Sequence, residues 1–478
     1  MQVLFVHQSF PAQFGHIAQR LRRDLNWSCT FVSQGPFDPA AAGIEGVDRI
    51  EYKPAGGATA QTHYCSRTFE NTVWHCDGVY EAMKNRPDVH PDLIVGHSGF
   101  GSTLFLRELY PHVPVINLFE YFYHPHDSDG DMDFRRDLGW KLDPYLYLRS
   151  RCRNAMLMLD LNNCQLGYCP TQFQLSRFPK EHRYKLRTIF DGIDRTLYHG
   201  RNGQLRPPVA ERGPRNLLGC NLPPGTRIVT YVARGMESMR GFDLFMQTAK
   251  LIARRVPDIA FFVVGSEGHA YGGDEAFIGQ HKTFKDWVLA QDDYDMEKFH
   301  FVGWQSPEDL STLLASTDLH LYWTVPFVLS WSMINAMSCG AVVLGSSTTP
   351  VKEFITDEAT GFLADFFNPQ EFAEKAVRIL QTPGQCRPVG RAAEELINSK
   401  YSIDAVMPLM LKMYEDSSKQ PAAPWTPAPV AAEAAIEEPQ SDDALTDAGM
   451  TSDRAATIMS DAAVVSKVRS PSRSPFRG

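Results

Sequence analysis

The chain has 478 residues, of which 43% are hydrophobic and 22% charged, and its formal net charge at pH 7 is −9. This is the composition of an ordinary globular protein with two or three domains. Acidic and basic residues are interspersed and no basic stripe occurs, which argues against nucleic acid as a partner, and no apolar run approaches the ~20 residues of a transmembrane helix.

The cysteines and the start of the chain indicate a cytoplasmic protein. The nine cysteines are scattered, and none forms the CxxC pair of a zinc or redox site. Scattered thiols in this pattern are typical of a reducing compartment. The opening "MQVLFVHQSF" begins directly with a strand-like run and lacks the charged segment of a signal peptide.

The first part of the chain alternates apolar runs with helical stretches. Continuous apolar runs separated by helices are typical of parallel strands that are buried on both faces. We therefore expect a doubly wound, Rossmann-like α/β domain over residues 1–195. Its strand-like runs lie at residues 3–7, 29–35, 92–99, 114–121 and 165–171.

A second α/β domain is predicted after a linker. Residues 196–226 are rich in proline, glycine and arginine, as expected of a connection between domains. The alternation of strand-like and helical segments then resumes, and it predicts a second doubly wound domain over 227–416. Its strand-like runs lie at residues 227–235, 259–267, 300–304, 318–324 and 341–347.

The composition changes again near the C-terminus. Residues 417–478 contain much proline, alanine and acid, little apolar patterning, and a short basic Ser-Pro-Arg tract at the end. We predict that this segment is disordered. The basic tract would suit an acidic partner or phosphorylation, although a solvated tail is the simpler interpretation.

Two doubly wound domains in tandem predict a ligand site between them. Ligands of such sheets bind at the carboxyl ends of the strands. Two domains that face each other would therefore form a cleft, with a nucleotide in one half and its reaction partner in the other.

Two arginines in the second domain are suited to a diphosphate. Arg234 ends the strand-like run 227–235, and Arg240 follows a short glycine-containing loop before the next helix. Two guanidinium groups at such a junction would neutralise a diphosphate and bond it in fork geometry. Both arginines would otherwise be solvated loop residues, and the position at a strand end favours the site.

The stretch "VPFVLSWSMINAMSCGAVVLGSS" (325–347) predicts a loop, a helix and a strand. The start of a helix offers unpaired N–H groups and a positive dipole end to an anion. The helix would open near Ser330, with N–H groups from Val328, Leu329 and Ser330 and hydroxyls from Ser330 and Ser332. Together with the two arginines, this start predicts a phosphate cradle.

These segments resemble a known family. "YVARGMESMRGFDLFM", "FFVVGSE", "FVGW", "PFVLSWSMINAMSCGAVVLGSSTTPVKEFI" and "TGFLADFF" are similar, in this order, to the donor half of family 4 glycosyltransferases. "FVHQSFPAQFGHIA", "DLIVGHSGFG", "FEYFYH", "CPTQFQLSRFP" and "IFDGID" resemble the acceptor half of a bacterial branch of that family. The resemblance covers roughly residues 1–415.

The resemblance implies a GT-B fold and retaining transfer of a sugar from a nucleotide-diphospho-sugar, without a metal or other cofactor. The acceptor stays open between a glycan, a lipid-linked sugar and a protein. Arg234 and Arg240 would be the diphosphate pair, although the second cation is usually a lysine and the gap is one residue longer here. Gly303 would lie beside the base, and Glu267 near the donor.

The family's acidic pair is missing. Family members usually carry two glutamates separated by seven residues, which bind the transferred sugar and the donor ribose. Here Asn335 holds the second place, and Phe327, or Val325 if the match follows Pro-Phe, holds the first. No acidic residue occurs between Asp318 and Glu353. Asn335 would still bond ribose hydroxyls, but without the charge assistance of a carboxylate.

The first domain supplies two acceptor-side candidates. His97 follows a buried strand within "GHSGFG", and the resemblance places it near the sugar and the acceptor. There it would orient reacting groups, because a phosphate oxygen is the expected proton acceptor in a retaining transfer. The alternative is a histidine bonded to backbone. Glu120 ends the run 114–121, and a structural ion pair is the competing interpretation.

The segment "HPHDSDGDMD" (124–133) suggests a metal site by composition. It fails as an EF-hand, because Met132 stands where glycine is needed and Leu138 where the last ligand is needed. The surrounding segments resemble a GT-B acceptor domain, in which metal-bound diphosphate is not expected. We therefore predict a solvated acidic loop and no metal.

Three functional classes are weighed from the sequence. The first is a retaining glycosyltransferase in which Arg234, Arg240 and the Ser330 helix start stabilise the leaving diphosphate. The second is a catalytically weak or inactive GT-B-like protein that binds nucleotide or glycan and acts through partners, as the missing acidic pair suggests. An oxidoreductase is disfavoured because no GxGxxG follows any strand-like run.

Overall fold

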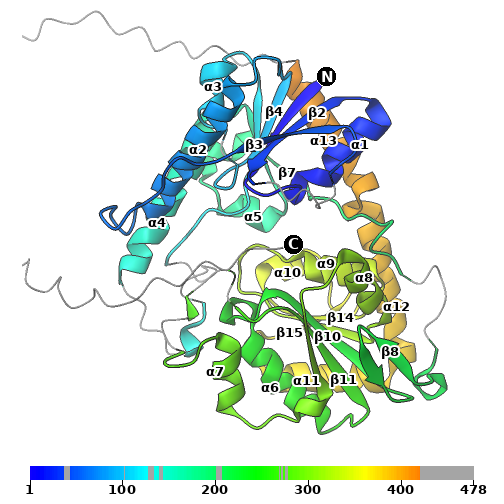
Figure 1. Ribbon diagram of the computed structural model, residues 1–478. Helices are drawn as coiled ribbons and strands as arrows, with labels where there is room; N and C mark the ends of the chain where they lie inside the picture. Colours follow the sequence, from blue (N-terminus) through cyan, green and yellow to red (C-terminus); the bar gives the residue numbers. More distant parts are fainter. Residues whose placement is uncertain are drawn as a thin grey trace, which may run out of the picture. The chain divides into compact units, whose positions relative to one another are not determined.

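The computed structural model describes residues 1–36, 43–101, 103–126, 134–138, 144–200, 207–268, 270, 273–274 and 278–419. All of these residues belong to one compact unit with two separate parallel sheets (Figure 1). The predicted disordered tail from residue 420 onward lies outside the described residues, as does the acidic part of the predicted metal-free loop, 127–133.

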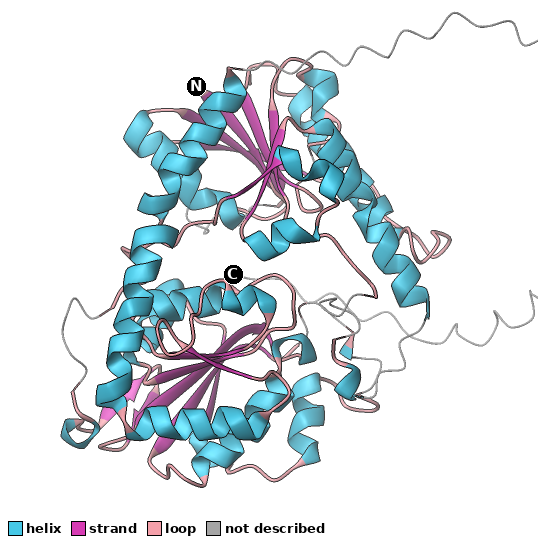
Figure 2. Ribbon diagram, turned by 180° about the vertical axis from the view of Figure 1, so that it is seen from behind, coloured by secondary structure: helices cyan, strands magenta, loops and turns pink. Residues whose placement is uncertain are grey.

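The first sheet has seven parallel strands in the order β3-β2-β1-β4-β5-β6-β7. The strands are β1 Gln2–Val6, β2 Ser28–Gln34, β3 Val47–Tyr52, β4 Leu93–His97, β5 Val115–Leu118, β6 Leu166–Cys169 and β7 Leu186–Thr188. Helices lie on both of its faces (Figure 2). They are α1 Gly15–Leu25, α2 Arg67–Lys84, α3 Leu106–Leu109, α4 Pro144–Asn163 and α5 Gln172–Arg177.

The second sheet has six parallel strands in the order β12-β11-β10-β13-β14-β15. The strands are β10 Arg227–Gly235, β11 Ile259–Ser266, β12 Phe299–Gly303, β13 Leu319–Tyr322, β14 Val343–Ser346 and β15 Phe362–Ala364. Its helices are α6 Phe242–Ala253, α7 Phe284–Gln291, α8 Pro307–Ser316, α9 Trp331–Ser338, α10 Thr349–Lys352, α11 Pro369–Gln381 and α12 Pro383–Leu396. The predicted architecture of two doubly wound α/β domains is thereby confirmed.

Five strands were not predicted, because one lies at a sheet edge and the other four are only three residues long. Strand β3 lies at an edge of its sheet, and its sequence VDRIEY alternates charged and apolar residues instead of forming a continuous apolar run. Strands β7 and β15 are only three residues long. The predicted linker holds a small antiparallel hairpin, β8 Arg215–Leu217 and β9 Cys220–Leu222.

The last described helix returns to the first sheet. Helix α13 (Ile403–Ser418) contacts strands β4 and β5, and its buried residues share one core cluster with residues of β1 and β2. The predicted boundaries place this segment in the second domain by its position in the sequence. Its packing partners are strands of the first sheet, because its apolar face (Val406, Met410 and Tyr414) is buried there.

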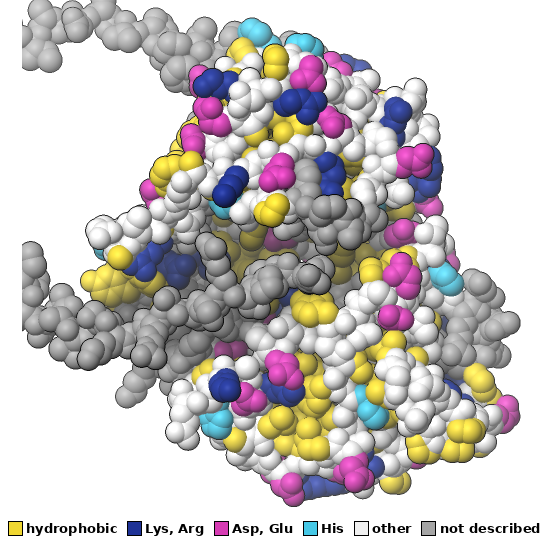
Figure 3. Space-filling model, in the orientation of Figure 1, with side chains coloured by type: hydrophobic (Ala, Val, Ile, Leu, Met, Phe, Trp, Pro, Cys, Tyr) yellow, Lys and Arg dark blue, Asp and Glu magenta, His cyan; other side chains and the backbone are white. Residues whose placement is uncertain are grey.

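The distribution of charged side chains on the surface agrees with the interspersed charges of the sequence. On the face drawn in Figure 3, basic and acidic side chains of the described residues lie interspersed and do not gather by sign. No helix in the described ranges is long and apolar enough to cross a bilayer.

Candidate functional site

Both sheets place polar residues at the point where their strand order reverses. In the first sheet the reversal lies between β1 and β4, where His7 follows β1 and His97 ends β4. In the second it lies between β10 and β13, where Arg234 is the last residue but one of β10 and Thr324 follows β13. Such reversal points, at the carboxyl ends of the strands, are where doubly wound sheets bind ligands.

Arg240 is fixed against the loop that leads into α9. It ends a single 3-10 turn, Ser238–Arg240, and is only 3% exposed. Its Nη1 atom donates to Thr324 Oγ1 at 2.6 Å and to the carbonyl of Val328 at 3.2 Å. The next residue, Gly241, has a φ of +61°, and a Cβ there would meet the Trp323 side chain at 2.7 Å. A larger residue would therefore clash with Trp323 directly after Arg240, and the position is suited to glycine.

Arg234 is exposed at the end of β10. Its charge nevertheless acts on the first domain, together with that of Arg240. The pKa of Glu120 is raised to about 7 by burial and by the nearby charge of Asp191, and the charges of Arg234 and Arg240 oppose this rise. The two predicted diphosphate arginines therefore lie within electrostatic reach of the same carboxyl group.

The start of α9 is built as predicted, with one correction. Ser330 is the N-cap, and its Oγ accepts from the N–H of Ser332. The N–H of Ser330, however, donates to the Tyr322 hydroxyl at 2.9 Å, so that it is not free to bind phosphate in this structure. Within the described residues no hydrogen bond engages the N–H groups of Val328 and Leu329, which leaves them for an anion.

Asn335 lies within the second turn of α9 and is 4% exposed. Its Oδ1 atom is buried without a hydrogen-bond partner in the part of the chain that the structure describes. An unpaired buried amide oxygen costs about 1–3 kcal/mol. A hydroxyl of a bound ligand would remove this cost, as the predicted contact with a ribose requires.

Phe327 packs against an aromatic side chain of the first domain. Its ring meets that of Tyr121, from the segment after β5, with centroids 4.5 Å apart in a T-shaped arrangement. The Tyr121 hydroxyl donates to the carbonyl of Pro326 at 3.3 Å. Val325, the other position considered for the first acidic residue, is fully buried. The place of the missing carboxylate is therefore occupied by hydrophobic packing.

The remaining donor-side residues differ in their surroundings. Glu267 is exposed and forms an ion pair with Lys285 of α7 at 2.5 Å, which points to a surface role. Gly303 ends β12 with a φ of +68°, and among the described residues other than its two chain neighbours, no atom lies within 4 Å of the position of its missing Cβ. The adjacent Trp304 is 66% exposed. Only Gly303 therefore keeps the open surroundings that a base requires.

His97 is buried without a hydrogen bond to either ring nitrogen among the described residues, so the alternative of a backbone-bonded histidine does not hold. Its Nε2 lies 3.8 Å from Glu120 Oε2, and its ring centroid lies 5.2 Å from that of His7. Burial, and secondarily the neighbouring His7, holds the pKa of His97 well below its ordinary value. His97 is therefore a neutral ring at pH 7.

Two glutamine side chains hold Glu120. Gln13 donates to its Oε1 atom at 2.9 Å, and Gln174 donates to its backbone carbonyl at 2.6 Å. Its side chain stays about a quarter exposed (26%). The glutamate is thus positioned by amide groups and has no arginine or lysine salt bridge within the described residues, which does not fit the competing interpretation of a structural ion pair.

Asp191 was not among the predicted site residues. It lies three residues after β7, is 6% exposed, and accepts from Trp331 Nε1 of α9 at 2.9 Å. Burial raises the pKa of Asp191 to about 6. Because β7 has only three residues, no clear strand end marks this carboxylate, although Asp191 lies within the quoted segment IFDGID.

A buried carboxyl supports the loop after His97. Asp160 of α4 is fully buried, and its Oδ2 accepts from Ser98 Oγ at 2.6 Å. Burial raises the pKa of Asp160 from 3.8 to about 7. A raised pKa means that the folded state favours the protonated form. Its stabilising contribution is complete below about pH 4 and is lost as the pH rises toward 7.

We therefore expect Asp160→Asn to change the dependence of stability on pH. The amide cannot ionise, so the melting temperature of the variant relative to the natural protein should rise between pH 4 and about pH 7 and then level off. Thermal unfolding at several pH values measures this difference. Parallel curves for the two proteins would show that Asp160 does not titrate in this range.

His124 and His126, which begin the predicted metal-free loop, contact neighbouring protein groups. His124 Nε2 lies 2.6 Å from the carbonyl of Arg177, and the His126 ring stacks on Tyr147 with centroids 4.3 Å apart. In the described part of the chain, no three His, Cys, Asp or Glu side chains gather in a way that would hold a metal.

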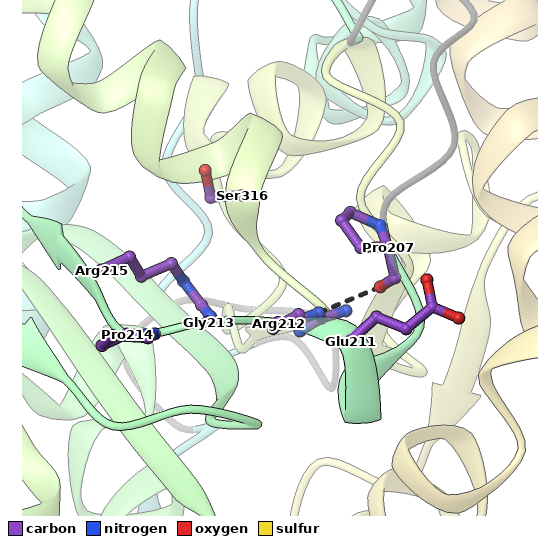
Figure 4. A pocket seen from close by; sticks show the side chains of 7 residues that line it. All are labelled: Pro207, Glu211, Arg212, Gly213, Pro214, Arg215 and Ser316. Atoms are coloured by element: carbon purple, nitrogen blue, oxygen red, sulfur yellow. Dashed lines mark hydrogen bonds between the residues drawn. The ribbon is translucent and has the colours of Figure 1, made fainter.

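A pocket of about 250 Å³ lies elsewhere, beside the linker (Figure 4). Its lining includes Arg212, whose guanidinium is bound to both carboxylate oxygens of Asp318 at 2.7 Å. Asp318 directly precedes β13, so this pocket lies at the amino ends of the strands. Because ligands of such sheets bind at the opposite edge, we do not assign the candidate site to it.

Two known families match the chain. Residues 26–197 match the family described as Glycosyl transferase family 4 group, and residues 220–396 match Glycosyl transferases group 1. Spore coat protein SA of Bacillus subtilis (strain 168) is 26% identical over 247 residues, which are 50% of this chain and 61% of that protein. The match thus spans less than two thirds of that relative's length.

Solved structures share the fold. Sucrose-phosphate synthase from Thermosynechococcus elongatus superposes with a TM-score of 0.61 at 15% identity, over 87% of this chain and 98% of that one. Anabaena Alr3699/HepE, solved in complex with UDP and glucose, superposes with a TM-score of 0.56 at 14% identity, over 87% of this chain and all of that one (100%). At these identities the likeness concerns the fold.

Proposed function

We propose that this chain, which belongs to the glycosyltransferases of the GT-B fold, transfers a sugar from a nucleotide-diphospho-sugar to an acceptor with retention of configuration. Residues 26–197 belong to the family 4 group and residues 220–396 to group 1. The transfer breaks the bond between the anomeric carbon and the diphosphate oxygen. A new bond to the acceptor oxygen then forms on the same face of the sugar.

The observation that carries the proposal is the convergence of positive groups at the second sheet's reversal point. Arg240 is held between Thr324 and the carbonyl of Val328, directly beside the start of α9. Arg234 and the N–H groups of Val328 and Leu329 complete the arrangement. Charges and dipoles that are fixed in advance stabilise a leaving diphosphate at little reorganisation cost.

The first sheet supplies the groups that orient the reaction. His97 is neutral and has no hydrogen-bond partner among the described residues, so it can bond a hydroxyl of either substrate. The proton of the attacking hydroxyl passes to a leaving phosphate oxygen, which becomes basic as its bond to carbon breaks. His97 thus orients groups and does not take the proton.

One observation favours a second candidate function. Phe327 and Asn335 occupy the positions of the family's acidic pair, and Phe327 is committed to packing against Tyr121. A protein that binds nucleotide or glycan without catalysis would tolerate both replacements. The two functions predict the same nucleotide binding and differ in turnover.

A panel of nucleotides and nucleotide sugars tests the proposal, with UDP and UDP-glucose first because Anabaena HepE is solved with UDP and glucose. A ligand at 100 times its Kd adds about 2.7 kcal/mol to the free energy of unfolding, which thermal unfolding detects. We expect one nucleoside diphosphate to bind, and the matching nucleotide sugar to be consumed slowly in water. Binding without any turnover would favour the second function, and no binding of any nucleotide or nucleotide sugar would contradict the transferase function.

A further inference from the structure

A group of buried polar atoms without partners lies at the carboxyl ends of β4, β5 and β7. Both ring nitrogens of His97 and the Oδ1 atom of Asp191 have no hydrogen-bond partner within the described residues. The two side chains are 1% and 6% exposed. Because burying such atoms unpaired is costly, they indicate a ligand that is absent from the structure.

Glu120 joins these atoms into one set. Its Oε2 lies 3.8 Å from His97 Nε2, and its Oε1 accepts from Gln13. The same short segment contacts both carboxylate residues, because Gln13 donates to Glu120 and His16 Nε2 lies 2.6 Å from the backbone carbonyl of Asp191. Burial, and secondarily the charge of Asp191, raises the pKa of Glu120. Asp191 is itself fixed by Trp331 Nε1 at 2.9 Å, so its second oxygen is left for the ligand.

The hydrogen-bonding capacity of the set defines its ligand. Two carboxyl groups accept hydrogen bonds, and a neutral imidazole donates with one nitrogen and accepts with the other. Hydroxyl groups match this combination, because each donates once and also accepts. A molecule with several neighbouring hydroxyls would pair all of these atoms at once.

Aromatic rings border the set. Phe100, 46% exposed, lies with its ring centroid 4.9 Å from that of His97, and Trp331, 37% exposed, is the partner of Asp191. Exposed rings beside polar groups suit a molecule with an apolar face and a hydroxyl edge, as a sugar ring has.

We propose that Asp191, Glu120 and His97 form an acceptor subsite for an uncharged, hydroxyl-rich molecule of the sugar or polyol class, and that the two carboxyl groups reject an acceptor carrying a phosphate near the reacting hydroxyl. The inference rests on the proposed transferase function. It assigns Asp191 a role in acceptor selection that depends on its negative charge.

The rejection of phosphate follows from the separation of charges across the site. Arg234 and Arg240 lie on the donor side, where the diphosphate of the donor occupies them. On the acceptor side, a phosphorylated acceptor would meet the like charges of Asp191 and Glu120, and neither carboxyl group forms an ion pair with a lysine or arginine of the described residues. Like charges brought together in this way discriminate between ligands by repulsion.

Pairs of matched acceptors test the proposal. The probes are methyl glucoside against glucose 6-phosphate, and myo-inositol against inositol 3-phosphate, each with the nucleotide sugar that the panel identifies. Binding is followed by ligand-observed NMR in the presence and absence of the nucleoside diphosphate, and turnover by nucleoside diphosphate release. We expect a neutral member to bind and to be used at least tenfold more efficiently than its phosphorylated partner.

Variants then assign this preference to its residues. Asp191→Asn and Glu120→Gln should each narrow the neutral-to-phosphorylated ratio at least tenfold, mainly through KM, whereas Asp286→Asn, an exposed carboxylate on α7, should leave the ratio unchanged. A preference for the phosphorylated partner, an unchanged ratio in folded variants, or no binding of any neutral probe would overturn the proposal. Failure of the transferase function itself would show separately, as the absence of nucleoside diphosphate release with every acceptor, whereas the NMR binding measurements still test the subsite.

Discussion

Replacing Arg240 by alanine should weaken the binding of a nucleoside diphosphate by about 1.5–3 kcal/mol, or roughly ten- to more than a hundredfold in Kd. The guanidinium is 3% exposed and already fixed by Thr324 Oγ1 and the carbonyl of Val328. It therefore loses little side-chain entropy on binding the anion, and its charge acts in partly desolvated surroundings. Isothermal calorimetry on the natural protein and the variant measures the difference.

Two further variants separate the site from general charge. Arg240→Lys keeps the charge and loses the fork geometry, so its affinity should fall between those of the natural protein and Arg240→Ala. Arg254→Ala removes an exposed arginine that follows the C-terminal end of α6, and it should have no effect beyond about twofold. Unchanged affinity in a folded Arg240→Ala variant would exclude this arginine from the donor site.

Most of the fold could be predicted because parallel strands buried on both faces leave an unmistakable pattern. Strand β11, for example, is buried over nearly its whole length, and its sequence IAFFVVGS is almost continuously apolar. Strand β3 could not be found in this way, because only one of its faces is covered and its residues alternate. The return of α13 to the first sheet depends on tertiary packing, which no local pattern in the chain records.

The residues of the candidate site could likewise be predicted only in part. Arg234, His97 and the α9 start could be located because each directly follows or ends a clear structural signal. Asp191 follows a strand of only three residues, and its importance depends on a contact with Trp331, 140 positions further along the chain. The engagement of the Ser330 N–H by the Tyr322 hydroxyl depends likewise on how a loop closes over β13. Such contacts are set by geometry and not by composition.

The second large effect is expected at Asn335. Its side chain is 4% exposed on α9 and its Oδ1 lacks a partner in the described part of the chain, so Asn335→Glu places a carboxylate where nothing compensates it. In the free protein we expect the free energy of unfolding to fall by about 3 kcal/mol, as for other uncompensated buried charges. Thermal or denaturant unfolding at pH 7 measures this loss.

The same variant should bind the donor nucleotide more tightly if Asn335 faces a ribose. A carboxylate accepting from ribose hydroxyls forms charge-assisted bonds, which are worth about 1 kcal/mol more than those of an amide. Nucleoside diphosphate should therefore restore part of the lost stability, whereas inorganic pyrophosphate, which has no ribose, should bind both proteins alike.

Asn335→Leu provides the matched control for this pair of effects. It removes the unpaired oxygen without adding a charge, so the free protein should be at least as stable as the natural one, while the affinity for nucleoside diphosphate falls. Equal or weaker nucleotide binding by Asn335→Glu would mean that no hydroxyl reaches α9 at this depth. The amide would then be a remnant of the family's acidic pair, and the protein that binds nucleotide or glycan without catalysis would become the better account of this chain.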